Sequence, residues 1–241
     1  MMTMLYADLV RLRTLRSGYA VLFLLVAVVV GITGASLSGA GAEGMTTSTQ
    51  LREPLTASVG ILVAVAAALF AAMRVGGEYR YGTMGQRLLA SPRRIRFLQA
   101  TLAVHGLVGL AVGAVALGAG LAIGLPMLAA EDRSMAMSPQ IVAAVLYAVI
   151  AYSLIGVCCG VIFRSQSAAV LVIVGAFFVE KILGMFIGDG AAYLPYGLLT
   201  PLLRLEGATI AQTPAAAALA VTTLALIALA ARLFSRRDVT S

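Results

Sequence analysis

The chain has 241 residues, of which 61% are hydrophobic and only 11% are charged, and its net charge is +7. Water-soluble domains have about 45–50% apolar and about 25% charged residues, so the composition excludes an ordinary soluble protein. The basic residues stand in short runs between apolar segments and Trp is absent, so the charge indicates membrane topology rather than nucleic-acid binding.

Six apolar segments are long enough to cross a bilayer, which takes about 20 residues at 1.5 Å per residue. They are residues 19–37, 55–73, 97–125, 139–163, 167–187 and 214–231. Ser138 before Pro139 and Thr213 before Pro214 are typical of helix starts, because the hydroxyl accepts from an unpaired N–H. The sequence therefore predicts an all-α integral membrane protein, with residues 1–241 forming a single transmembrane domain.

The segments outside these spans complete the predicted architecture. Residues 1–17 should form an amphipathic helix at the membrane interface, because their leucines recur on one face. Residues 75–92 form a cytoplasmic loop, and residues 188–213 form an extracytoplasmic segment. The apolar stretch 198–205 within it is too short to span, so we expect it at the interface or dipping into the membrane.

The distribution of basic residues predicts the orientation. With six spans, thirteen of the seventeen Lys and Arg residues fall on the side of the two termini and of loop 75–92, and three fall on the other side. Cytoplasmic loops carry the excess of positive charge. We therefore expect both termini in the cytoplasm and the chain in the cytoplasmic (inner) membrane of a bacterium.

The third span, 97–125, contains two pairs of glycines spaced four residues apart, Gly109/Gly113 and Gly120/Gly124. Small residues at this spacing lie on one helix face and allow a neighbouring helix to approach closely. The pairs therefore predict tight packing of this helix, without saying which helices it meets.

The loop after the second span has internal structure. Thr83 and Gln86 have the spacing of a capping box, and Met84 and Leu88 share one face of the short helix that follows. Pro92 ends that helix, because the residue before a proline is pushed out of the α region. Two interpretations stay open on this pattern: a solvated basic loop near anionic headgroups, and a docking helix for a soluble partner.

The loop resembles the E-x-x-x-G-T…LL-x-x-P-x-R pattern of ABC-2 type transporter permeases, at Glu78, Gly82, Thr83, Leu88, Leu89, Pro92 and Arg94. Its place after the second of six spans, the basic N-terminus and the apolar segment before the last span are also similar to that family. The layout thus covers the whole chain, whereas the motif covers only residues 78–94.

The resemblance implies a permease subunit of an ATP-binding-cassette exporter. Two permease copies, identical or related, would pair with two ATPase subunits, and loop 75–92 would be the coupling helix. The docking residues would be Glu78, Gly82, Thr83, Met84, Arg87, Leu88 and Leu89. ATP and Mg would be bound by the partner ATPase, because this chain has no G-x-x-x-x-G-K-[ST] sequence. The chain itself would bind no cofactor, would not be an enzyme, and would move a hydrophobic or amphipathic molecule such as a drug, an antibiotic or a lipid.

Three ionisable residues fall inside the predicted spans. His105 lies about two turns into the third span, and Glu180 and Lys181 lie toward the outer end of the fifth. Ionisable groups in a membrane are costly and often functional, so these residues are candidates for a substrate path. The structural alternatives are hydrogen-bonded packing of His105, an interhelical salt bridge of Glu180 and a Lys181 that extends to the interface.

Two other functions stay open. The first is a secondary transporter driven by an ion gradient through His105 or Glu180, and the second is a membrane scaffold that moves nothing. An enzyme is not expected, because the sequence has one His, no metal-ligand cluster and two adjacent cysteines inside an apolar run.

Overall fold

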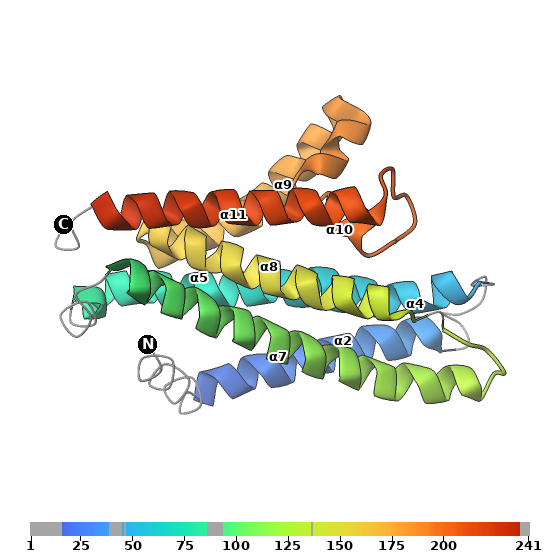
Figure 1. The fold of residues 1–241 in the computed structure, drawn as a ribbon. Coiled ribbons are helices and arrows are strands. Elements are labelled where there is room, and N and C mark those ends of the chain that lie inside the picture. Colours follow the sequence, from blue (N-terminus) through green and yellow to red (C-terminus); the bar gives the residue numbers. More distant parts are fainter. Residues whose placement is uncertain (1–15, 39–44, 46, 86–93, 136, 237–241) are drawn as a thin grey trace.

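The structure is a computed structural model that describes residues 16–38, 45, 47–85, 94–135 and 137–236. Every regular element in these ranges is a helix (Figure 1). The elements are α2 (Arg16–Leu37), α4 (Ser48–Ala57), the π-helix η1 (Ser58–Val63), α5 (Ala64–Arg80), α7 (Arg94–Ala129), α8 (Pro139–Phe163), α9 (Gln166–Ile187), the 3₁₀-helix η2 (Gly188–Tyr193), α10 (Leu199–Leu202) and α11 (Gln212–Arg236). Residues 1–15 of the predicted interfacial helix and residues 86–92 of the predicted coupling helix lie outside the described residues.

Within the described part of the chain, five helical segments are long and apolar enough to cross a membrane. They are Ser48–Arg80, Arg94–Ala129, Pro139–Phe163, Gln166–Tyr193 and Gln212–Arg236. At the predicted first span, the apolar stretch of α2 is Phe23–Leu37. It is shorter than these five segments and does not count among them. The apolar helices indicate a membrane location, and the sixth span stays a prediction.

The outside of the bundle is apolar as well. Large hydrophobic side chains point outward from several helices, among them Phe23 (76% exposed), Leu171 (71%), Met185 (84%) and Val221 (67%). Soluble monomers rarely expose large contiguous apolar patches. In a bilayer these side chains would face lipid tails, which are as apolar as they are, so their exposure carries no cost of contact with water.

The centre of the bundle is α8. It packs against α5, α7, α9 and α11, and Figure 1 shows it between α7 and α11. In its most apolar stretch 61% of the residues are buried, whereas the figure for α9 is 6%. The far end of α9 leans away from the other helices in Figure 1. Helix α8 is therefore the core of the fold, and α9 offers most of its surface to whatever surrounds the bundle.

Glycines set the distance between α5 and α8. A Cβ atom at Gly156 would clash with the backbone carbonyl of Ala68, and one at Gly160 would lie 2.8 Å from Cβ of Val75. The two backbones are therefore closer at these points than any side chain permits. In a membrane such packing of small residues carries helix association, because lipid removes the hydrophobic drive between helices.

The two predicted glycine pairs on α7 meet different neighbours. Gly109 and Gly113 face α8, where a Cβ atom at Gly109 would lie 3.0 Å from Cβ of Ser153. Gly120 and Gly124 face α2 and α4, through side chains that include Val29, Leu37 and Leu55. One helix thus packs against both the core and the first helix.

The second helix is longer than the predicted span 55–73. It runs without a break from α4 through η1 into α5, over Ser48–Arg80. Its start is a capping box: Gln50 N donates to Oγ1 of Thr47 and Thr47 N donates to Oε1 of Gln50, each over 3.3 Å. The predicted span, which begins at residue 55, missed this start, because the first turns of α4 are polar and carry no apolar periodicity.

The apolar stretch 198–205 enters the bundle. Four of its five leucines are at most 1% exposed: Leu198, Leu199, Leu202 and Leu203. A Cβ atom at Gly60 in η1 would lie 2.5 Å from Cδ1 of Leu203, so the π-helical turn and α10 are in close contact. Just after α10, the backbone oxygen of Arg204 accepts a hydrogen bond from Nη2 of Arg52 at 3.0 Å. The segment is thus anchored to the start of the second helix as well as to its middle.

Gly156→Ala should lower the free energy of unfolding by about 1–3 kcal/mol, because the added methyl group forces α5 away from α8. Thermal unfolding in detergent can be followed with a thiol-reactive dye, since Cys158 and Cys159 are the two cysteines of the chain and both are buried. Gly118→Ala on α7 is the matched control, because nothing lies within 4 Å of its Cβ position. Equal unfolding temperatures for the two variants would contradict this account of the core.

Candidate functional site

The segment predicted as a loop from residue 75 begins as the end of a helix. Glu78 lies in the last turn of α5, which continues to Arg80. Tyr81 closes the helix by donating its backbone N–H to Gly77 O over 2.9 Å. Gly82 follows with φ of 66°, a conformation that glycine adopts without steric cost. Glu78 and Gly82 therefore belong to a helix end and the left-handed turn that reverses the chain.

A new helix begins directly after this turn. Residues 83–85 are helical, and Oγ1 of Thr83 donates to Glu78 O over 3.4 Å. Met84 is 2% exposed and packs in a cluster with Phe97 of α7 and Phe234 of α11. The sequence assigned Met84 to the docking surface, but its side chain is turned into the bundle, where burial of an apolar side chain is favourable. Met84 therefore anchors the turn, and its place among the docking residues stays a prediction.

The turn between α8 and α9 lies beside the same helix end. Helix α8 ends at Arg164, which has φ of 52°, and its guanidinium lies 5.8 Å from the ring centre of Tyr79. A Cβ atom at Gly76 would lie 2.7 Å from Cα of Gln166, so α5 and the start of α9 touch through their backbones. Sequence reasoning missed this contact, although Arg164 is the one charge in the short connection after α8. We call residues 76–85 together with Arg164 the Glu78 end.

Three predicted docking residues cannot be placed. Arg87, Leu88 and Leu89 lie outside the described residues, as does Gln86 of the predicted capping box. Their role stays a prediction, and the Glu78 end includes only residues that precede them in the chain, together with Arg164.

His105 lies at the contact of α7 with α8. Its side chain is 8% exposed, and its Nδ1 lies 2.9 Å from Thr101 O one turn earlier. Its own backbone carbonyl accepts from Oγ of Ser153 over 2.8 Å. These are the contacts of a hydrogen-bonded packing residue, and a role in a substrate path stays a prediction.

Glu180 binds backbone rather than another helix. Its Oε2 accepts from Tyr196 N at 2.8 Å and from Gly197 N at 3.1 Å. The phenol of Tyr196 donates to Ile173 O over 2.6 Å, and burial, reinforced by the nearby Glu180 carboxylate, raises the pKa of Tyr196 to about 12. The phenol therefore stays a donor at neutral pH. Glu180 and Tyr196 together fasten the connection before α10 to α9.

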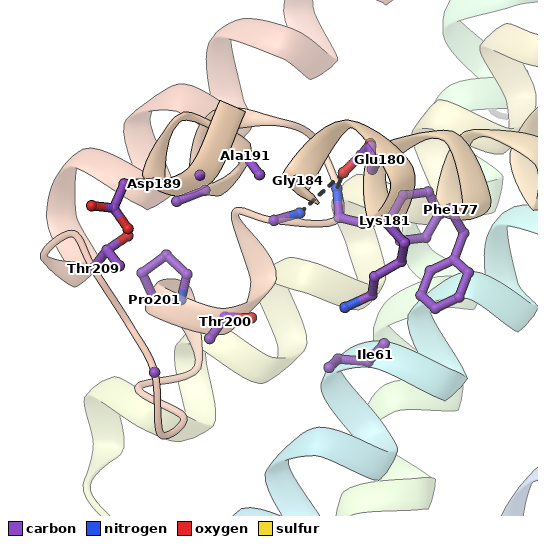
Figure 2. Close-up of a pocket in the computed structure, with 15 residues that line it drawn as sticks. Ile61, Phe177, Glu180, Lys181, Gly184, Asp189, Ala191, Thr200, Pro201 and Thr209 are labelled. Atoms are coloured by element: carbon purple, nitrogen blue, oxygen red, sulfur yellow. Dashed lines mark hydrogen bonds between the residues drawn. The ribbon is translucent and has the colours of Figure 1, made fainter. Parts of the chain in front are cut away.

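A cavity of about 290 Å³ opens beside Glu180, between α9, η2, α10 and the π-helical turn (Figure 2). Lys181 extends along it toward Ile61, with Nζ 5.7 Å from the ring centre of Phe177. The other polar side chains of the lining are Asp189, Tyr196, Thr200 and Thr209. We call this cavity with its lining the Glu180 end.

The two ends lie far apart along one helix. Ile61 lines the cavity, and Glu78 follows seventeen residues later in the same continuous helix, a rise of about 25 Å at 1.5 Å per residue. The structure thus brings Glu180 and Lys181 together in one cavity. It places Glu78, Gly82 and Thr83 at the opposite end of the bundle.

No protein-family model matches this chain, and a search of curated proteins gives no significant match. Among the described residues, no group of three or more His, Cys, Asp or Glu side chains could hold a metal ion.

Glu180→Ala should destabilise the protein by about 1–3 kcal/mol, because it leaves two half-buried backbone N–H groups without their acceptor. Glu180→Gln should cost less, since its amide oxygen can still accept. The thiol-dye unfolding measurement reports both, and Glu131→Ala, at an exposed position in the turn after α7, serves as the control. An unchanged unfolding temperature for Glu180→Ala would show that these hydrogen bonds do not fasten the segment.

Proposed function

We propose that this chain is the membrane-spanning subunit of an ATP-binding-cassette exporter of the ABC-2 type. A separate ATPase subunit, which binds ATP and Mg, docks on the Glu78 end, and the complete exporter contains two membrane-spanning subunits. The observation that supports this most is the build of the Glu78 end. A helix end, a left-handed turn at Gly82 and a helix start anchored by Met84 make a defined platform, which a plain linker between two spans does not need.

The contacts of this platform explain how a movement of the docked ATPase would be transmitted to the helix bundle. Met84 packs in one buried cluster with Phe97 of α7 and Phe234 of α11, so movement of the turn would bear on both helices. Helix α5 is held against α8 at Gly156 and Gly160, so it moves as a rigid unit with the core. Closure of the ATPase pair would then shift the bundle between two packings, since packed interfaces favour discrete arrangements.

The proposed topology has six spans with both termini in the cytoplasm of a bacterium. Helix α2 supplies the first span: its 22 residues rise about 33 Å, against about 30 Å for a hydrocarbon core. The Glu78 end is then cytoplasmic and the Glu180 end faces outward. The substrate is hydrophobic or amphipathic, such as a drug, an antibiotic or a lipid-like molecule, because the helices are built mainly from Ala, Val, Leu and Gly.

Cysteine labelling tests the topology. Ser134→Cys, in the turn after α7, should react in intact cells with a maleimide that cannot cross membranes. Ser235→Cys, near the end of α11, should react only after the membrane is opened. Both serines are exposed, and the native thiols are buried, so the background is low. The reverse pattern, or labelling of both sites from one side, would rule out the proposed orientation.

The docking role is tested with purified ATPases encoded next to this chain. Glu78→Ala combined with Leu88→Asp should weaken ATPase binding about tenfold, equivalent to about 1.4 kcal/mol, and abolish stimulated ATP hydrolysis. The matched control is Glu131→Ala combined with Tyr193→Asp, which makes the same kinds of change at the other end of the bundle, where both residues are exposed.

Full binding and coupling by the Glu78/Leu88 variant would remove the basis of the proposal. Transport by the chain alone in proteoliposomes, driven by an ion gradient without any ATPase, would instead support a secondary transporter. Failure to move any substrate class with a bound ATPase would support a scaffold.

A further inference from the structure

The cavity at the Glu180 end has the size of a polar headgroup. Its volume of about 290 Å³ lies at the lower limit of ligand sites, which span about 300–1,000 Å³. A whole drug-sized amphiphile would not fit inside. A compact polar group fits, with the rest of its molecule outside the cavity.

Lys181 supplies a positive charge to the cavity, and in the described part of the chain it forms no ion pair. Among the described residues no carboxylate lies within 4.0 Å of its ammonium, and the Oε2 atom of Glu180 already accepts from Tyr196 and Gly197. A lysine near the end of a span commonly extends away from the protein to water. Here the side chain runs over Phe177 and along the cavity toward Ile61 (Figure 2). Its ammonium is therefore presented to a ligand in the cavity.

The opposite end of the cavity is suited to an amine. Figure 2 shows Asp189 beside Thr209 and well separated from Lys181, with Pro201 between them. A primary ammonium has three N–H donors, which a carboxylate and a hydroxyl can accept. A quaternary ammonium has none and favours aromatic faces instead. The two aromatic side chains of the lining are Phe177, which Figure 2 shows on the Lys181 side, and Tyr196, whose ring packs against Tyr152 and Phe177.

The net charge of the lining favours a zwitterion over an anion. The lining contains two carboxylates, Glu180 and Asp189, and one ammonium, Lys181. A purely anionic headgroup would be attracted by Lys181 and repelled by Asp189. A headgroup with a phosphate at one end and a primary ammonium at the other matches Lys181 and Asp189, while the Oε2 atom of Glu180 already accepts from Tyr196 N and Gly197 N.

The surface beside the cavity suits hydrocarbon chains. The end of α9 exposes large apolar side chains, including Met185 at 84% and Phe186 at 81%. In the most apolar 18-residue stretch of the helical segment Gln166–Tyr193, only 6% of the residues are buried. A lipid whose headgroup entered the cavity could therefore lay its acyl chains along α9.

We propose that the cavity between α9, η2 and α10 binds the headgroup of an aminophospholipid of the phosphatidylethanolamine class. Its phosphate binds Lys181, its ammonium binds Asp189 with Thr209, and its acyl chains follow the exposed face of α9. This inference rests on the proposed function in one respect: the proposed orientation of the chain places the cavity in the outer leaflet of the membrane.

The test uses the full chain alone, purified in detergent, with phosphatidylethanolamine, phosphatidylcholine and phosphatidylglycerol of identical acyl chains, and native mass spectrometry to count bound lipid. Phosphatidylethanolamine should bind about tenfold more tightly than either competitor. Lys181→Ala and Asp189→Asn should each reduce its affinity about tenfold, and Lys181→Arg should retain it. Asp189→Asn should also reduce the ratio of phosphatidylethanolamine affinity to phosphatidylglycerol affinity, because it removes the carboxylate that repels an anionic headgroup.

The matched controls are Arg133→Ala and Glu131→Gln, which alter an exposed ion pair of 3.5 Å in the turn after α7. They should leave binding unchanged, and the thiol-dye measurement verifies that every variant is folded. Tighter binding of phosphatidylglycerol would overturn the proposal, and so would equal binding of all three lipids or binding that no variant alters. Because no ATPase is present, such a failure would leave the docking of the Glu78 end untouched, and a failed docking experiment would leave the lipid result standing.

Discussion

The contact between α5 and α8 is the constraint on which the rest of the structure depends. Gly156 and Gly160 remove side chains where the two helices meet, so the backbone of α8 touches Ala68 and Val75 directly. Apolar side chains gain little by leaving lipid for protein, so close packing of small residues must carry the association. Once α8 is held in this way, it forms the surface on which α7, α9 and α11 assemble.

The continuous second helix joins the two ends of the molecule. It starts at the Thr47 capping box, widens at η1 to receive Leu203, and ends at the turn around Gly82. At each end, polar groups lie in apolar surroundings and find a different kind of partner. At one end Arg164 lies over Tyr79, and at the other Glu180 satisfies backbone N–H groups. The proposed exporter uses this helix as the link between ATPase docking and the outward cavity.

The sequence by itself determined the local features. A long apolar run has few alternatives to a helix, and α8 has the bounds 139–163 that its run and the Ser138 cap predict. The glycine pairs of α7 predicted close packing, and a Cβ atom at Gly109 would indeed crowd Ser153. The turn at Gly82 follows from the same kind of information, because its positive φ is a property of a few adjacent residues. The docking role of this turn and the sixth span stay predictions.

Only the tertiary structure decided which side chains meet and which way they face. The helix over Ser48–Arg80 exceeds its apolar run, because a capping box and contacts with distant leucines stabilise its polar first turns. Met84 is turned inward because it packs in one cluster with residues at the start of α7 and near the end of α11, and Arg164 meets α5 because α8 and α9 pack there. The partners of Glu180 are backbone groups sixteen and seventeen residues away. Helical periodicity is a local property, whereas these contacts depend on how whole helices pack, which no short pattern encodes.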